Sequence, residues 1–230
     1  MPTATYIARR GQIETYFDRT AAEAWKRLTS DAPVSGIRAT VRAGRDRMRA
    51  TLLDWLPADL RGRRLLDAGC GTGALATEAA RRGAHVVAID LSPTLVDLAR
   101  ERAPRDLRID FRVGDMLDAS LGRFDHVVGM DSLIHYRTHD VVRVVAGLAA
   151  RTDESLLFTF APRTPLLAVM HAVGRLFPRG DRAPAIQPVG AQSIANLLKR
   201  DPALDGWHLG RTHRIASGFY TSQALELVRT

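Results

Sequence analysis

Apolar and polar positions change rhythm twice along the chain, and the central stretch is the most regular. Between residues 60 and 160, short apolar runs alternate with segments whose apolar residues recur every three or four positions. The runs are typical of strands buried on both faces, and the segments between them of amphipathic helices. We expect strands at Arg64–Asp67, His85–Asp90, Leu107–Val113, Phe124–Met130 and Ser155–Phe160. Helices are expected from about Thr72 to Arg82, from Pro93 to Arg102 after the N-cap Ser92, and over Asp140–Ala150.

The first 60 residues show helical periodicity without strands. Thr20 and Glu23 have the spacing of a capping box, and the apolar face that follows reaches Leu28. A second apolar face runs from Ile37 to Leu56 and stops at Pro57. We therefore expect a helical N-terminal cap over residues 1–60, ahead of a main domain over residues 61–230.

Residues 161–189 interrupt the alternation with five prolines around an apolar stretch, Leu166–Phe177. That stretch is too short and too interrupted to span a bilayer, so we interpret the segment as an inserted lid. A helix at Gly190–Arg200 and two closing strands at Trp207–Ile215 and Phe219–Val228 complete the pattern. The order predicts a Rossmann-like α/β fold, with a mostly parallel sheet covered on both faces.

Composition narrows the class of protein only slightly. The 230 residues are 46% hydrophobic and 25% charged, with one cysteine, which excludes an internal disulfide framework and fits a cytoplasmic protein. The formal net charge is +8, almost entirely from arginine, because only Lys26 and Lys199 are lysines. This balance is typical of a GC-rich genome or of an acidic partner such as a carboxylate substrate or an anionic membrane. Basic tracts interleaved with aromatic residues are absent, which disfavours nucleic acid.

The strongest chemical signal is a glycine-rich loop at the end of the first expected strand. Leu65, Leu66 and Asp67 lead into Ala68-Gly69-Cys70-Gly71-Thr72-Gly73. Glycines at this point allow a tight turn and a close approach of backbone to a ligand at a helix N-terminus. We interpret Cys70 as a small loop residue, because no activating base lies beside it in the sequence.

Three acids follow three successive strands, and they decide what the loop binds. Asp67 precedes the first glycine, where a pyrophosphate would be repelled but the ammonium and sulfonium of S-adenosylmethionine would be attracted. Asp90 ends the second strand, where a carboxylate can accept both ribose hydroxyls. Asp115 follows the third strand, placed for the adenine amino group, with Leu91 and Met116 on either side of the ring. Each acid alone could merely cap a helix, but three in this pattern favour S-adenosylmethionine.

This pattern resembles class I S-adenosylmethionine-dependent methyltransferases over about residues 60–160. The resemblance implies a seven-stranded sheet whose last strand is antiparallel, and S-adenosylhomocysteine as product. It implies a cofactor site formed by Asp67, Gly69, Cys70, Gly71, Gly73, Asp90, Leu91, Asp115, Met116 and Met130, with no metal held by the protein.

His135 lies just past the fourth strand, in Asp131-Ser132-Leu133-Ile134-His135-Tyr136. Ligands of open α/β sheets bind at the carboxyl ends of the strands, so His135 is expected near the point of methyl transfer. Its imidazole titrates near neutrality and could take a proton or orient an anion. The alternative is a histidine that only hydrogen-bonds the backbone.

Segments beyond the cofactor motif resemble magnesium-protoporphyrin IX O-methyltransferases of chlorophyll and bacteriochlorophyll synthesis. They are Asp131–Tyr136, Phe160–Thr164, Gly174–Pro178, Gly218–Ser222, and Tyr16-Phe17 with Trp25. One departure is Gln187-Pro188, which replaces a small-residue stretch leading to a histidine in the family. The resemblance implies esterification of one propionate of magnesium protoporphyrin IX, with Mg²⁺ present only inside the substrate. His135 and Tyr16 are then the expected catalytic pair, and Tyr136, Arg163, Met170, Arg175, Phe177 and Tyr220 the expected substrate contacts.

A propionate is already ionised at neutral pH, so this reaction needs orientation more than a strong base. Other readings of the sequence remain open. They are an O-methyltransferase acting on a quinone precursor, a non-catalytic porphyrin carrier on the same fold, and an RNA methyltransferase. The resemblance also implies delivery of the porphyrin by the porphyrin-binding subunit of magnesium chelatase. It implies peripheral contact with a photosynthetic membrane, which the basic charge permits.

Overall fold

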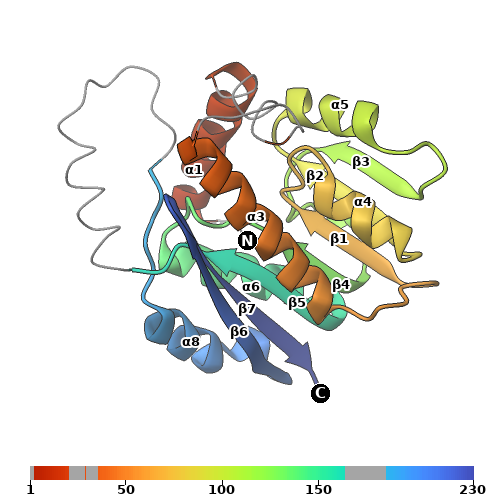
Figure 1. Cartoon of the computed structure of the whole chain (residues 1–230). Helices are drawn as coiled ribbons and strands as arrows, with labels where there is room; N and C mark the ends of the chain where they lie inside the picture. The colour runs from red at the N-terminus through yellow and green to blue at the C-terminus, as the bar shows by residue number, and fades with distance from the viewer. Residues whose placement is uncertain (1–2, 21–28, 30–35, 164–184) are drawn as a thin grey trace.

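The computed structural model describes residues 3–20, 29, 36–163 and 185–230 (Figure 1). In this part of the chain, seven strands form a single sheet in the order β3-β2-β1-β4-β5-β7-β6. They are β1 (Arg64–Ala68), β2 (His85–Asp90), β3 (Ile109–Val113), β4 (Phe124–Gly129), β5 (Thr152–Phe160), β6 (Trp207–Ser217) and β7 (Tyr220–Arg229). Strands β1 to β5 pair in parallel, and β7 is antiparallel to both β5 and β6. The expected mostly parallel sheet with an antiparallel last strand is confirmed.

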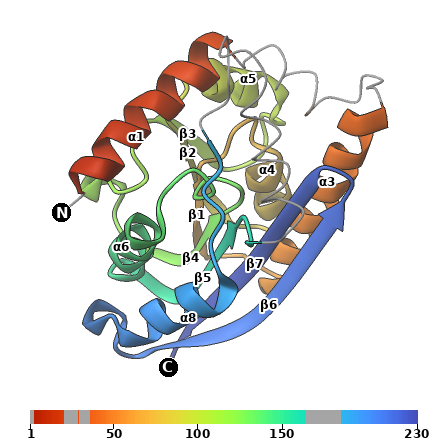
Figure 2. The ribbon, with the colours of Figure 1, turned by 90° about the vertical axis from the view of Figure 1, so that its left-hand side faces the viewer.

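Helices cover both faces of the sheet, as Figure 2 shows from the side. On one face lie α3 (Gly36–Trp55) and α4 (Ala74–Arg81), with α5 (Pro93–Arg102) beside β3. On the other lie α6 (Thr138–Ala149), α8 (Ala191–Arg200) and α1 (Ala4–Thr15), which continues into the short π-helix η1 (Tyr16–Thr20). Two single-turn 3₁₀ helices, Ala119–Leu121 and Pro202–Leu204, complete the described helices.

Local sequence signals explain several of these boundaries. Thr3 caps α1 by accepting a hydrogen bond from the Tyr6 amide at 3.0 Å. Ser92 caps α5 in the same way, with Pro93 in the first helical position, as expected. β5 begins at Thr152, three residues before its expected start, and its pairing register with β4 shifts between Phe124 and His126.

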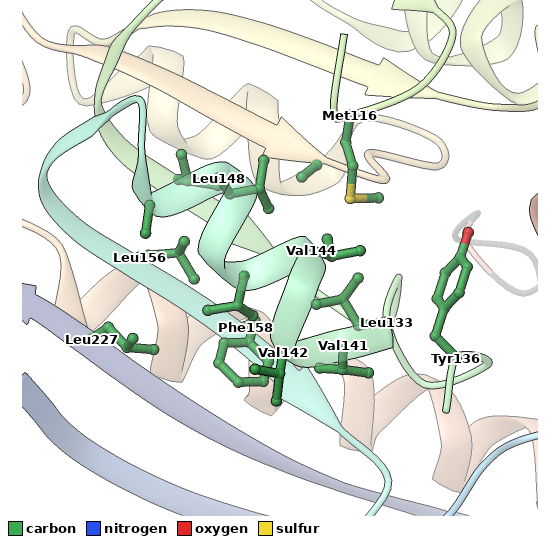
Figure 3. Close-up of a cluster of buried hydrophobic side chains, with 14 of the residues drawn as sticks. Met116, Leu133, Tyr136, Val141, Val142, Val144, Leu148, Leu156, Phe158 and Leu227 are labelled. Carbon is green, nitrogen blue, oxygen red and sulfur yellow. The ribbon is translucent and has the colours of Figure 1, made fainter. Parts of the chain in front are cut away.

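Two separate apolar cores lie on the two faces of the sheet. One surrounds α6, and Figure 3 shows its buried Leu148, Leu156 and Phe158 together with Tyr136 at its edge. The other lies under α3 and α4, where Met48 and Leu52 are fully buried. Helix α3, which belongs to the cap expected over residues 1–60, therefore packs on one face of the sheet.

The insertion expected at 161–189 is described only at its base. Pro162 and Val189 form an isolated parallel bridge, and the Arg163 amide donates to the Val189 carbonyl at 2.9 Å. The Gln187 amide donates to the Ile134 carbonyl at 2.8 Å, which ties this base to the loop after β4. The insertion therefore starts and ends beside the carboxyl ends of the strands.

Candidate active site at the carboxyl ends of the strands

The glycine loop joins β1 to α4, and three of its residues have no side chain. Gly69, Gly71 and Gly73 have φ angles of 89°, 53° and 76°, which favour residues without a Cβ. The Gly69 and Cys70 amides donate to the Ile89 carbonyl at 2.8 and 3.0 Å, so β2 holds the turn in place. A Cβ on Gly69 would overlap the Cβ of Ser132, because the loop after β4 packs directly against this glycine.

Asp67 and Asp90 accept hydrogen bonds from the backbone of this loop and of the helix that follows it. The buried carboxylate of Asp67 accepts from the Ala76 amide at 3.1 Å, in the first turn of α4. Asp90 accepts from the Gly71 amide at 2.8 Å and from the Ser92 amide at 3.0 Å. Both acids therefore cap backbone, yet each carboxylate has further acceptor capacity, because an ionised carboxylate offers about four lone-pair sites.

The charges around the loop suit a cationic ligand. Burial raises the pKa of Asp67 to about 7, with a further rise from the nearby charge of Asp90. Burial likewise raises the pKa of Asp90. No ion pair joins either acid to a cation within the described residues, so a bound ammonium or sulfonium would stabilise their ionised forms. S-adenosylmethionine carries both groups and fits this donor and charge pattern.

Cys70 is not an activated nucleophile. Its side chain is buried, and burial raises the pKa of its thiol, with further rises from the charges of Asp67 and Asp90. The thiol therefore stays protonated at neutral pH, in agreement with its interpretation as a loop residue.

Asp115, after β3, is held by the N-terminal helix α1. The Tyr6 hydroxyl donates to its Oδ1 at 2.7 Å, and the Arg10 guanidinium lies 2.8 Å from its Oδ2. The Leu117 amide also donates to Oδ1, at 2.9 Å. Tyr6 is buried and stacks on Tyr136, with ring centroids 4.9 Å apart. Helix α1 therefore closes the side of the site where the adenine is expected.

The three apolar side chains expected at the cofactor lie at this edge of the sheet. Met116 and Met130 are buried, one in each core, and Leu91 is partly buried against the core around α6. Figure 3 shows Met116 at the margin of that core, beside Val144 of α6. They follow Asp90, Asp115 and β4 directly in the sequence, and their contact with the adenosine stays a prediction.

His135 lies in an aromatic cluster with both residues of the Tyr16-Phe17 pair. Its side chain is buried, and its ring meets the edge of Phe17 with centroids 6.1 Å apart. Phe17 in turn meets Tyr16 edge-on at 5.1 Å. The predicted catalytic pair therefore shares one neighbour, although the two residues are far apart in the sequence. Asp18 anchors the same segment, because it accepts from the Thr94 hydroxyl at 2.7 Å.

The expected substrate contacts differ in where they lie. Tyr136 is almost fully buried in the core around α6, and Tyr220 is buried with its hydroxyl 3.1 Å from Asp131 Oδ2. Arg163 is exposed at the base of the insertion. Met170, Arg175 and Phe177 lie outside the described residues.

Several residues at this edge carried no signal in the sequence. Tyr6 and Arg10 lie in a polar helix and reach Asp115 across more than 100 positions. Asp131 was visible inside a motif, but its partner Arg45 is one of many arginines in α3. Only the three-dimensional contacts of the two N-terminal helices with Asp115 and Asp131, which follow strands, identify these residues.

A cavity of about 460 Å³ lies between the start of α1, α6 and the segment joining β3 to β4. Tyr6, Asp140 and Arg143 contribute to its walls, but neither the glycine loop nor His135 does. It is therefore not the predicted cofactor site. The described residues contain no group of three or more His, Cys, Asp or Glu side chains that could hold a metal ion, and no described helix is long and apolar enough to cross a membrane.

Two family models match the chain. Residues 129–229 match the C-terminal part of magnesium-protoporphyrin IX methyltransferases, and residues 65–153 match a general methyltransferase domain. The first match covers the loop after β4, the insertion and the closing strands, which is the side expected to hold the methyl acceptor. The second covers the glycine loop and all three acids.

Whole-chain comparisons agree with these matches. The chain is 50% identical to a magnesium-protoporphyrin O-methyltransferase of Rhodobacter capsulatus, with 96% of this chain and 97% of that protein covered. It is 31% identical to the protein of the same name from Synechocystis, with 95% of each covered. A crystal structure of magnesium protoporphyrin IX methyltransferase from Synechocystis PCC 6803 with bound S-adenosylhomocysteine superposes with a TM-score of 0.83 at 30% identity. The alignment covers 95% of this chain and 98% of that one.

Proposed function

The chain belongs to the magnesium-protoporphyrin O-methyltransferase family, and on that premise we propose that it methylates a propionate of magnesium protoporphyrin IX. The observation that carries the proposal is the agreement of two halves of one site. The glycine loop and its acids fit S-adenosylmethionine, and the family match over residues 129–229 covers the elements that face it.

The residues of the cofactor half have distinct tasks in this proposal. Asp67 would balance the positive charge of the cofactor, and Asp90 would accept its ribose hydroxyls. Asp115, held by Tyr6 and Arg10, would form the outer wall at the adenine. When bound, S-adenosylmethionine supplies an electrophilic methyl group on a sulfonium, and S-adenosylhomocysteine is the product.

The acceptor half has little acid–base work to do. A propionate carboxylate is ionised at neutral pH, and the ester forms when its oxygen bonds to the methyl carbon as the bond to sulfur breaks. His135 would orient this carboxylate, and Tyr16 would donate a hydrogen bond from the segment that carries Phe17. His135 is buried, and because the carboxylate needs no strong base, orientation would account for most of the rate.

A turnover assay with S-adenosylmethionine and three acceptors tests the proposal. Magnesium protoporphyrin IX, metal-free protoporphyrin IX and a catechol are supplied in parallel, and products are identified by mass. We expect a monomethyl ester from the magnesium porphyrin, formed at least ten times faster than any other product. Preferential methylation of the catechol would support a quinone-precursor enzyme instead. Tight S-adenosylhomocysteine binding without any product would support a porphyrin carrier.

We further propose that the porphyrin-binding subunit of magnesium chelatase delivers the substrate, and that the protein contacts a photosynthetic membrane at its surface. The net charge of +8 supports attraction to anionic headgroups, and the exposed Ile7, Ile37 and Phe219 offer apolar contact. Cosedimentation with anionic and neutral vesicles tests the membrane contact, and binding only to anionic vesicles at low salt is expected. Transfer of porphyrin from the purified subunit, faster than its spontaneous release, is expected for the delivery step.

A further inference from the structure

Asp131, directly after β4, has an unusual backbone conformation. Its φ of 54° makes it the only non-glycine residue with positive φ in the part of the chain that the structure describes. This left-handed conformation is unfavourable for residues with a Cβ, although aspartate and asparagine tolerate it best. Such strain persists only where surrounding contacts impose it, and it is found most often at functional sites.

The contacts that impose it come from three other elements. The Asp131 carboxylate accepts from Arg45 of α3 at 2.6 Å, from Ser222 of β7 at 3.0 Å and from Tyr220 of β7 at 3.1 Å. Thr159 of β5 donates its hydroxyl to the same carboxylate at 3.1 Å and accepts from the Asp131 amide at 2.7 Å. The side chain and the backbone amide of Asp131 are therefore both held by hydrogen bonds.

Stability alone does not account for this arrangement. The Asp131 side chain is 6% exposed and that of Arg45 is 19% exposed, so the ion pair is largely buried. Moving two charges out of water offsets much of their attraction, and apolar residues of similar shape are often at least as stabilising. A buried ion pair combined with a strained backbone indicates that these contacts fix the position of this segment.

The turn that begins at Asp131 contacts three parts of the active site. Ser132 packs against Gly69 of the glycine loop, the Ile134 carbonyl accepts from Gln187 at the base of the insertion, and His135 meets Phe17. A rotation of the backbone at Asp131 would move all three contacts together. Asp131 itself lies behind the turn, among α3, β5 and β7, and its carboxylate is already occupied by four donors.

We propose that Asp131 is a positioning residue, which holds the turn 131–136 so that His135 faces the methyl acceptor at the correct distance from the glycine loop. This inference rests on the proposed function, because it assigns the turn a role in methyl transfer. It predicts that disturbing the Asp131 carboxylate lowers the rate of transfer while cofactor binding is retained.

The test compares two variants that each neutralise a buried carboxylate paired with arginine. Asp131→Asn keeps the size of the side chain and the tolerance for positive φ, but it removes the charge that Arg45 needs. Glu226→Gln is the matched control, because Glu226 is buried on β7 and accepts from Arg211 Nε at 2.7 Å, away from the turn. For each variant, kcat, the KM for magnesium porphyrin, the Kd of S-adenosylhomocysteine and the imidazole NMR signals of His135 are measured.

We expect Asp131→Asn to lower kcat at least tenfold, with the Kd of S-adenosylhomocysteine within twofold of the wild type, and to shift the His135 signals. Glu226→Gln should change none of these, even where its melting temperature falls equally. Unchanged His135 signals and kcat in Asp131→Asn would overturn the proposal, as would equal losses in both variants. If the wild type binds S-adenosylhomocysteine but forms no ester, the proposed function fails, and the His135 signals still decide whether Asp131 positions the turn. If Asp131→Asn does not fold, Ser222→Ala removes one donor and should shift the same signals by a smaller amount.

Discussion

Two aspartates, one after β3 and one after β4, are each held by an arginine and a tyrosine, but in different ways. Asp115 is held by Arg10 and Tyr6 of α1, and its ion pair with Arg10 is 2.8 Å long with the side chains 13% and 36% exposed. Asp131 is held by Arg45 of α3 at 2.6 Å with 6% and 19% exposed, and the Tyr220 hydroxyl donates to it from β7. One clamp therefore lies at the surface and the other in the interior.

This difference assigns different roles to the two N-terminal helices. Surface ion pairs contribute about 0–1 kcal/mol and are screened by salt, so the pair of Arg10 with Asp115 adds little to the hold that the buried, stacked Tyr6 gives α1. A buried pair tolerates the loss of one partner poorly, because the other charge is left without compensation. Helix α3 is therefore a fixed part of the fold that supports the acceptor side. Helix α1 covers the cofactor side, and its ion pair is partly exposed.

The largest expected effect comes from substitution of Gly69, the residue of the glycine loop that contacts Ser132 in the turn held by Asp131. Gly69→Ala places a methyl group on Ser132 at a φ of 89°, and should lower the affinity for S-adenosylhomocysteine at least 100-fold. Gly62→Ala is the control, because Gly62 has a φ of 77° but open space around its Cβ position. Calorimetric titration of both variants checks this. Equal affinities in the two variants would contradict the prediction, because Gly62 precedes β1 and the glycine loop follows it.

Removing the arginine of each clamp tests the comparison directly. Arg45→Met should lower the free energy of unfolding by about 3 kcal/mol, because the buried Asp131 carboxylate loses its counter-charge. Arg10→Met should lower it by at most about 1 kcal/mol, since the pair with Asp115 is partly exposed. Urea unfolding at low and high salt measures both changes. A larger loss from Arg10→Met would reverse the assignment of the two helices.

The pKa of Asp67 predicts a pH dependence on the cofactor side. Burial raises this pKa to about 7 in the free protein, and a bound cation favours the ionised carboxylate. Affinity for S-adenosylmethionine should therefore rise as the pH increases through 7, by about tenfold between pH 6 and 8, with release of a proton on binding. Titrations in buffers of different ionisation enthalpy count that proton. Asp67→Asn should bind more weakly, and its affinity should not vary over this range.

The same shift affects folding with the opposite sign. Because the pKa of Asp67 is higher in the folded state, its contribution to stability is complete below the unfolded value near 4. That contribution is lost as the pH rises through about 7, and saturating cofactor should remove the loss. Melting temperatures with and without S-adenosylhomocysteine would contradict this if the two pH profiles were parallel.

The smallest expected effect concerns the surface clamp. Tyr6→Phe removes one hydrogen bond to Asp115 but keeps the ring that stacks on Tyr136, so S-adenosylhomocysteine should bind about threefold to tenfold more weakly. Tyr136→Phe, which removes the hydroxyl of the other ring of the stack and leaves the Tyr6 hydroxyl in place, is the comparison. An equal effect from both would mean that the hydrogen bond from Tyr6 to Asp115 has no special part in cofactor binding.

Sequence patterns predicted the sheet, its two helical layers and the cofactor loop, because each depends on neighbouring residues. The apolar run from Val86 to Ile89 is enough to predict a buried strand. The glycines from Gly69 to Gly73 are enough to predict a turn at the end of β1. The clamps were not predictable in this way. Arg45 contacts Asp131 across 86 positions, and nothing in α3 distinguishes it from the other arginines there.

Asp131 illustrates a second limit. Its place in a motif beside His135 was visible, but its positive φ was not, because aspartate is common in ordinary loops as well as in left-handed turns. The predicted pairing of His135 with Tyr16 rested on resemblance, and the structure brings both to Phe17. Their roles in transfer stay predictions.

The most direct test of the account is the rate of ester formation by His135→Ala with S-adenosylmethionine and magnesium protoporphyrin IX both saturating. If the turn anchored by Asp131 presents His135 to the propionate, kcat should fall about 100-fold, and His135→Asn should recover part of it. The Kd of S-adenosylhomocysteine should stay within threefold of the wild type, because His135 lies outside the glycine loop. Full turnover by His135→Ala under these conditions would contradict the account.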